Sequence, residues 1–126
     1  MTSGCPKSNM ASYDMSLKVI MEPLPLTEPV LLILLSLAGQ PRHGYSILKD
    51  VEQMSDGRVV LSTGTLYGAL RRLLDDDWIE PFKEQDNSRG RQAYRLTARG
   101  RRNLQAEASR LKHLARLANL RMVKEA

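Results

Sequence analysis

The feature that most limits how this chain can fold is an apolar stripe at heptad spacing near its C-terminus. Its members follow one another in steps of four and three residues, the spacing of a coiled-coil seam: Leu104, Ala108, Leu111, Ala115, Ala118 and Met122. A chain of 126 residues forms one small domain, whose thin core cannot also cover a long terminal helix. We therefore predict a helix from Thr97 to about Val123 that pairs with a second copy of the chain through these six residues.

The charges of the chain are divided unevenly along its length. Residues 1–86 hold 8 Lys and Arg against 12 Asp and Glu, whereas residues 87–126 hold 11 against 2. The basic part is rich in arginine, whose planar fork suits phosphate groups. With a net charge of +5, this distribution favours a polyanionic partner such as nucleic acid.

Three helices are expected before the basic region. The first runs from about Thr27 to Ala38, because Thr27 is a good N-cap and Gly39 with Pro41 ends the apolar run. The second covers roughly residues 44–54, where apolar residues recur at helical spacing. The third runs from about Gly64 to Asp76, with Ser62 and Thr63 as capping residues. A hairpin follows, with strands at 78–84 and 92–96 and a polar loop between them.

The third helix has the character of a helix that enters the major groove of DNA. Its first turn is small and polar, and free backbone N–H groups at a helix start can bind phosphate. Asp75, Asp76 and Asp77 lie at its other end and would repel phosphate, so we expect the N-terminal end to face DNA. In the hairpin loop, Arg89 and Arg91 could reach a phosphate or the minor groove.

The order of elements therefore predicts a mainly α fold with a small β-hairpin, a winged helix-turn-helix plus a C-terminal dimerisation helix. We divide the chain into a tail at 1–25, a DNA-binding domain at 26–96 and the dimerisation helix at 97–126. The tail contains Met1, Met10, Met15 and Met21, which leaves the true start of the protein open.

Catalytic, metal and membrane functions lack support in the sequence. There is no Ser/His/Asp set, no convergent pair of carboxylates and no cluster of metal ligands, so we expect no enzyme, no metal and no cofactor. The apolar run at 30–38 is shorter than the ~20 residues that span a bilayer. The single cysteine, Cys5, forms no disulfide within the chain, which fits a cytoplasmic protein.

Several short motifs in order along the chain resemble the PadR-type winged-helix regulators. They are His43-Gly44-Tyr45, then Gly64-Thr65-Leu66-Tyr67 followed by Ala69-Leu70-Arg71-Arg72-Leu73, then Tyr94-Arg95-Leu96-Thr97 with Gly100. The short C-terminal part resembles the subgroup with one dimerisation helix. Two positions depart from the family, which often has Gly at the position of Asp77 and Pro at that of Gly68.

The resemblance implies a homodimer that binds a palindromic operator, usually represses transcription, and in some relatives leaves DNA when a small-molecule effector binds. By position, it implies that the residues contacting double-stranded DNA are Tyr45, Ser62, Thr63, Thr65, Tyr67, Arg89 and Arg91. For the two tyrosines, packing between helices is the alternative interpretation. The alternative function is a winged-helix protein-interaction module without DNA binding.

Overall fold

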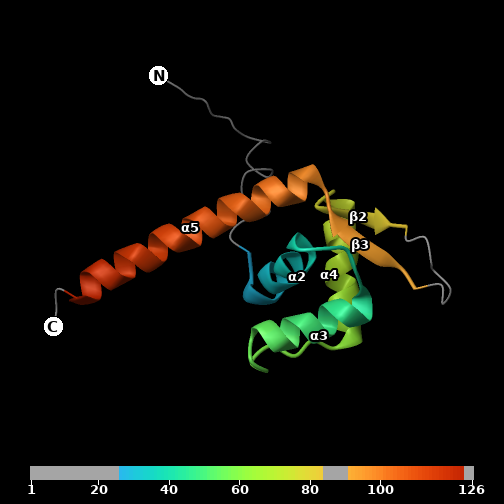
Figure 1. The fold of residues 1–126 in the computed structure, drawn as a ribbon, viewed down its shortest axis with the longest axis horizontal. Helices are drawn as coiled ribbons and strands as arrows, with labels where there is room; N and C mark the ends of the chain where they lie inside the picture. The colour runs from blue at the N-terminus through green and yellow to red at the C-terminus, as the bar shows by residue number, and fades with distance from the viewer. Residues whose placement is uncertain (1–25, 84–90, 124–126) are drawn as a thin grey trace, which may run out of the picture.

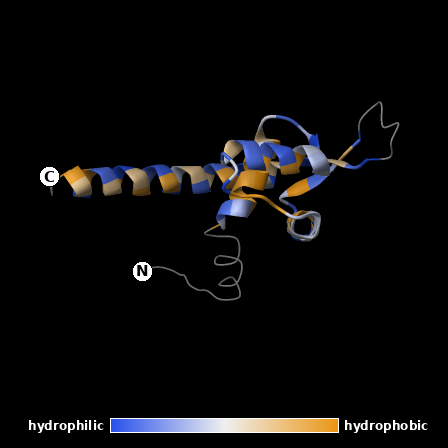
Figure 2. Ribbon diagram, turned by 90° about the horizontal axis from the view of Figure 1, so that it is seen from below, coloured by the Kyte–Doolittle hydropathy of each residue, from blue (hydrophilic) through white to orange (hydrophobic). Residues whose placement is uncertain are grey.

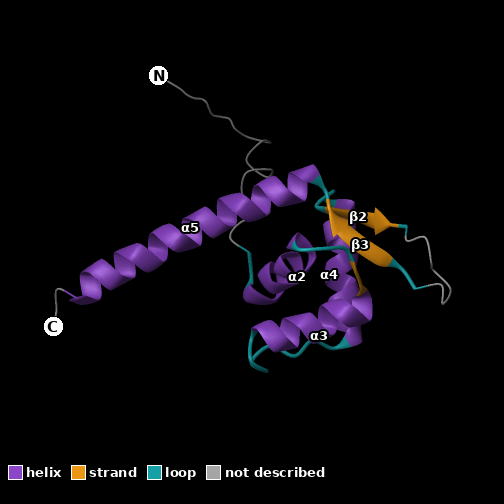
Figure 3. Cartoon of the chain, viewed as in Figure 1, coloured by secondary structure: helices purple, strands orange, loops and turns teal. Residues whose placement is uncertain are grey.

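The computed structural model describes residues 26–83 and 91–123, so the predicted tail at 1–25 and most of the hairpin loop lie outside the described residues. In chain order the elements are α2 (Glu28–Ala38), β1 (Arg42–His43), α3 (Gly44–Met54), α4 (Thr63–Asp75), β2 (Ile79–Phe82), β3 (Ala93–Leu96) and α5 (Ala98–Val123). Helices dominate, and the strands form one small antiparallel sheet (Figures 1 and 3). The predicted fold class, a winged helix-turn-helix followed by a long helix, is confirmed.

Helix boundaries agree with the capping residues in the sequence. The Thr27 side chain accepts a hydrogen bond from the backbone N–H of Val30, and Pro29 occupies the first turn of α2. Thr97 accepts from the N–H of Gly100 and so caps α5. In α2 and α5 a threonine oxygen before the helix thus satisfies a donor that has no partner within the helix.

The first strand was not predicted from the sequence. β1 is two residues long and pairs with β3, placing Arg42 opposite Tyr94 and His43 opposite Ala93. The strand order is β1-β3-β2, so β2 lies at an edge. An edge position accommodates Pro81, which cannot donate a ladder hydrogen bond.

The hydrophobic core collects residues from every helix and from the sheet. α2 packs against α3, α5 and β3, which explains why so much of this apolar helix is buried. Trp78 at the entry to β2 is also buried. The buried core residues are Ile33, Leu34, Leu37, Ile47, Val51, Leu66, Leu70, Leu73, Trp78, Ile79, Tyr94, Leu96 and Leu104. Within the described residues, no helix is both long and apolar enough to cross a membrane.

Asp77, which follows the C-cap of α4, has a left-handed backbone conformation with φ 64°. Its N–H donates to the carbonyl of Leu74, and the N–H of Trp78 donates to that of Leu73. These two bonds form a Schellman motif, whose left-handed position is normally glycine. The local geometry accounts for the difference from the family: the turn is kept, with aspartate in the glycine position.

Replacing Asp77 with Gly should therefore stabilise the protein. Glycine removes the left-handed strain and also a negative charge near the negative end of α4, together about 1 kcal/mol in the free energy of unfolding. Chemical denaturation would measure it. Asp76→Gly is the control: it removes the same negative charge, but Asp76 has φ −88°, so no left-handed strain is relieved. The greater freedom of glycine in the unfolded chain offsets the gain from the charge, so this variant should not be more stable than the parent. An Asp77→Gly protein no more stable than the parent would contradict this interpretation of the turn.

The long helix α5 packs on the domain only through its first turns and then extends away from it (Figures 1 and 2). Glu107 marks the end of the packed part: it is 1% exposed, accepts from the Leu26 N–H at 3.2 Å, and pairs with Arg110. The hydrogen bonds from Arg110 lower the pKa of Glu107, and the Leu26 N–H acts in the same direction. This carboxylate therefore stabilises the fold above the usual pKa of Glu, a contribution lost as the pH falls through the lowered value.

Candidate nucleic-acid interface

The first turn of α4 is exposed and held by a compact set of hydrogen bonds. The Ser62 hydroxyl accepts from the N–H of Thr65 at 3.1 Å and donates to the Thr65 hydroxyl at 3.0 Å. Because Thr65 accepts this hydrogen bond, its own hydroxyl hydrogen remains available to an acceptor outside the chain. The N-cap thus orients a donor outward from the end of the helix.

Backbone donors lie in the same turn. The N–H groups of Thr65 and Leu66 both bond to Ser62. Helix geometry leaves those of Thr63 and Gly64 without an acceptor inside the helix. Exposed N–H groups at the positive end of a helix dipole attract phosphate. Of the residues implied by the resemblance, Ser62, Thr63 and Thr65 thus share one exposed helix end.

Two glycines leave this face of α4 without bulky side chains. A Cβ built at Gly64 or at Gly68 would meet nothing within 4 Å, so the packing of the chain itself does not require glycine there. Each costs roughly 0.5–1 kcal/mol of helix stability relative to Ala. Their absence of side chains lets another surface approach the helix backbone closely.

The two tyrosines of the implied set lie near this face and differ in their packing. Tyr45 on α3 is 62% exposed, with the Lys49 ammonium 5.8 Å from its ring centroid. Tyr67 on α4 is 46% exposed, and its ring rests on Gly44, where an added Cβ would collide with the phenol. Tyr67 therefore has a packing role, in agreement with the alternative interpretation, and still presents much of its ring outside.

Beside Tyr67 a shallow cavity of about 260 Å³ touches α4. Its lining includes Arg71, Asp75 and Tyr94. Burial raises the pKa of the Tyr94 phenol, and the neighbouring Tyr67 adds to the increase. Arg71 and Arg72 are exposed and follow Gly64 and Gly68 along the same side of α4. The DNA-contacting residues implied by the resemblance do not include these two arginines, although their helical spacing from the glycines places them on the same side of α4.

The arginines around the sheet have different surroundings. Arg91 precedes β3 and is exposed, whereas Arg89 lies outside the described residues. Arg95 is engaged within the sheet: its Nε donates to Glu80 at 2.7 Å and its guanidinium lies 5.3 Å from the Phe82 ring centroid. Asp75, Asp76 and Asp77 are exposed at the far end of α4, so the helix carries the expected charge asymmetry.

The predicted dimer seam needs one correction. Leu104 is 6% exposed and belongs to the core of its own chain, because the first turns of α5 lie on the domain. The seam that stays exposed therefore begins after it and consists of Ala108, Leu111, Ala115, Ala118 and Met122. These residues continue along the helix the same face that Leu104 buries.

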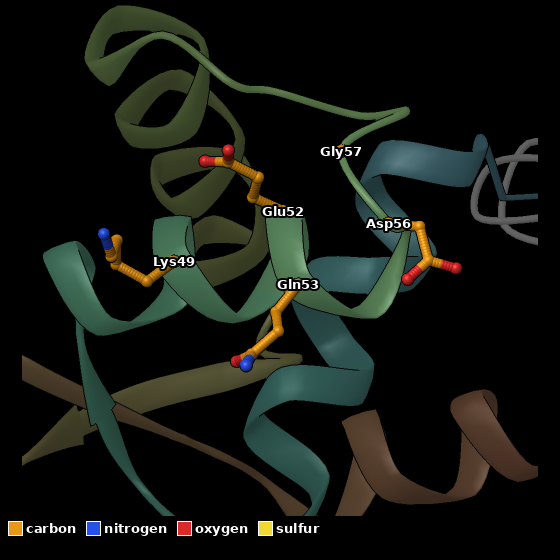
Figure 4. Close-up of a pocket in the computed structure, with 5 residues that line it drawn as sticks. All are labelled: Lys49, Glu52, Gln53, Asp56 and Gly57. Atoms are coloured by element: carbon orange, nitrogen blue, oxygen red, sulfur yellow. The ribbon is translucent and has the colours of Figure 1, made fainter.

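On the other surfaces of the described residues the chemical groups do not converge on one point. A cavity of about 420 Å³ lies beside α3, and Figure 4 shows its side chains directed to different sides. Its lining residues are Lys49, Glu52, Gln53, Asp56 and Gly57. Within the described residues, no group of three or more His, Cys, Asp or Glu could hold a metal ion.

Comparisons with known proteins agree with this geometry. The family model described as "Transcriptional regulator PadR-like family" matches residues 32–106. A curated relative, an uncharacterized 37.1 kDa protein in transposon TN4556 of Streptomyces fradiae, is 41% identical over 85 residues, 68% of this chain. The chain spans only 23% of that relative's length.

Solved structures show the same fold. A PadR family transcription regulator from Clostridium difficile R20291 is 24% identical with a TM-score of 0.64, over 76% of this chain and 99% of that one. A PadR family regulator from Eggerthella lenta DSM 2243 is 26% identical with a TM-score of 0.58, over 86% and 88%. Bacillus subtilis PadR in complex with operator DNA is 20% identical with a TM-score of 0.54, over 61% and 44%.

Proposed function

This chain belongs to the PadR-like family of transcriptional regulators, which are not enzymes, and we propose that it is a homodimeric repressor acting on a palindromic operator. The observation that carries the proposal is the exposed first turn of α4, with hydroxyl and backbone donors and two glycines that leave the helix open. The DNA-contacting residues are Tyr45, Ser62, Thr63, Thr65, Tyr67, Arg89 and Arg91, joined by Arg71 and Arg72 at phosphates.

Each part of the chain has one task in this proposal. Residues 26–96 bind DNA, with α4 in the major groove and the hairpin loop beside it. Residues 97–126 form the dimer through the seam, which leaves two copies of α4 related by two-fold symmetry. A two-fold protein reads a two-fold site, and repression follows when such a site overlaps a promoter.

A small-molecule effector belongs to the same proposal. The seam contains no aromatic residue, so we do not propose a pocket for an aromatic ligand between the α5 helices. The cavity lined by Tyr67, Arg71 and Tyr94 touches the helix that would read DNA. A ligand there competes with DNA for Arg71, and release of the operator is the expected effect.

Selection of bound duplexes from a random DNA pool tests the main proposal. We expect enrichment of a two-fold symmetric site whose affinity falls steeply with salt, because each neutralised phosphate releases counterions. Titration of the selected site at two salt concentrations measures this. A well-folded dimer that enriches no sequence would reject the proposal and favour a protein-interaction module.

The loop arginines can be tested on the selected site. Arg89→Ala with Arg91→Ala should weaken operator binding about tenfold or more and reduce the salt slope by about 0.9 for each phosphate that is no longer neutralised. The matched control is Arg95→Ala, since Arg95 is already paired with Glu80; it should change affinity much less. Equal affinity of the double variant and the parent would remove the loop from the DNA interface.

A further inference from the structure

The helix α5 is the most strongly charged element of the described chain. Its cations are Arg99, Arg101, Arg102, Arg110, Lys112, Arg116 and Arg121. Its one acidic residue, Glu107, is buried and bonded to Arg110. Within residues 26–83 and 91–123, no carboxylate forms an ion pair with the other six cations. Every exposed charge on this helix in the described residues is therefore positive.

This arrangement works against the helix itself. Three arginines lie in the first turns, where the helix dipole disfavours cations, and no acidic residue accompanies them there. Lys112 and Arg116 are one turn apart, a spacing at which like charges repel. A pattern that costs folding free energy and meets no compensating charge within the fold indicates a role outside the fold.

The domain that carries α4 has no such excess of positive charge. Residues 26–96 hold 9 Lys and Arg against 10 Asp and Glu. The positive potential that attracts a polyanion over a distance is therefore concentrated on α5.

The side of α5 away from the seam is suited to phosphates. We call it the cationic face, defined as Arg99, Arg102, Lys112 and Arg116. The side chains among these cations, Gln105, Ser109 and His113, are polar and exposed. A protein partner usually needs an apolar or aromatic anchor near the centre of the interface. Leu120 is exposed on this side of the helix, one turn beyond Arg116, but between Arg99 and Arg116 the cationic face has no large apolar side chain. A nucleic-acid backbone needs only cations, and the arginine fork matches its phosphates.

The cationic face is also separate from the first turn of α4. α2 packs against both α3 and α5 and lies between α5 and the helix-turn-helix (Figure 1). We propose that the cationic face binds the phosphates of a second segment of duplex DNA, distinct from the operator. The inference rests on the proposed function only in assigning the operator to α4; the face binds duplex DNA in its own right.

A capture experiment tests this on the full-length protein. Immobilised operator duplex is saturated with protein and then offered a labelled duplex of random sequence. We expect the complex to capture the second duplex, and Arg102→Gln with Arg116→Gln to reduce this capture about tenfold while operator affinity changes less than about threefold. The charge-matched control, Arg58→Gln with Arg121→Gln, removes two cations outside the cationic face and should retain capture.

A second arm separates this proposal from the operator-binding function. Protein with Arg89→Ala and Arg91→Ala is offered the random duplex without operator. This variant should still bind the random duplex. When Arg102→Gln and Arg116→Gln are added to it, the salt slope of binding should fall by about 0.9 for each phosphate that is no longer neutralised. The proposal is wrong if the parent captures no second duplex, or if the Arg102 and Arg116 substitutions leave capture unchanged. It is also wrong if polyglutamate, a polyanion without phosphates, is captured in place of DNA. Each of these results counts whether or not an operator is found.

Discussion

Replacing Leu111 with Asp is expected to convert the protein from dimer to monomer. Leu111 is the one leucine of the seam that α5 exposes beyond Glu107. In a symmetric pair the substitution places two like charges in one apolar contact, where each loses hydration without gaining a partner. We expect dimer affinity to fall at least 100-fold, about 3 kcal/mol, and operator binding to fall with it. Light scattering over a range of concentrations measures the change.

The helix supplies its own control. Leu120 is exposed and lies nine residues from Leu111, two and a half turns along, so it is on the opposite side of α5. Leu120→Asp should leave the dimer intact. If both variants dissociate equally, or if Leu111→Asp remains a dimer, the seam is not the interface.

Replacing Gly100 with Ala is expected to destabilise the domain strongly. A Cβ at this position would collide with the carbonyl oxygen of Trp78 and lie 2.9 Å from its carbonyl carbon. These are backbone atoms held by Thr97, whose N–H donates to the same Trp78 carbonyl at 3.0 Å. Because the turn cannot yield as a flexible side chain would, we expect a loss of about 3 kcal/mol in the free energy of unfolding.

Chemical denaturation with a matched glycine variant separates this clash from helix propensity. Gly68 is also helical, and a Cβ there meets nothing within 4 Å. Gly68→Ala should therefore stabilise the protein by roughly 0.5–1 kcal/mol. A Gly100→Ala protein as stable as the parent would mean that α5 can move away from the turn before β2.

Much of the fold follows from local signals in the sequence. Thr27, Ser62 and Thr97 each precede a helix and cap it as expected. Capping and apolar spacing act over a few residues, so they can be recognised without knowing what packs where. For the same reason, α3 and α4 begin and end within one residue of the predicted bounds.

The features that sequence reasoning missed depend on contacts between distant segments. β1 is too short for any periodic signal and exists because Arg42 and His43 pair with β3. Leu104 has the heptad spacing of the seam, but the docking of α5 on the domain buries it within its own chain. Spacing alone cannot tell which turns of a long helix lie on their own domain.

The candidate DNA interface was predictable to a similar degree. The small polar residues of the first turn of α4 can be recognised in the sequence. In the structure this turn is exposed, and Ser62 and Thr65 are joined by a hydrogen bond. The contacts of Arg95 with Glu80 and Phe82 could not be predicted without the register of the sheet, which sets residues of neighbouring strands side by side. The contact between Tyr67 and Gly44 likewise required the packing of α3 on α4.

The anchoring of α5 has a geometric consequence for DNA recognition. Between residues 101 and 123 this helix contains no Pro or Gly, and its base is fixed at Gly100 and at the buried Glu107. Such a helix is stiff, so a dimer built on two of them would hold its two copies of α4 at one separation and one relative rotation. One base pair inserted between half-sites turns them by about 34°, since B-DNA has about 10.5 base pairs per turn. We therefore expect the proposed dimer to depend on the spacing of the two half-sites as well as on their sequence.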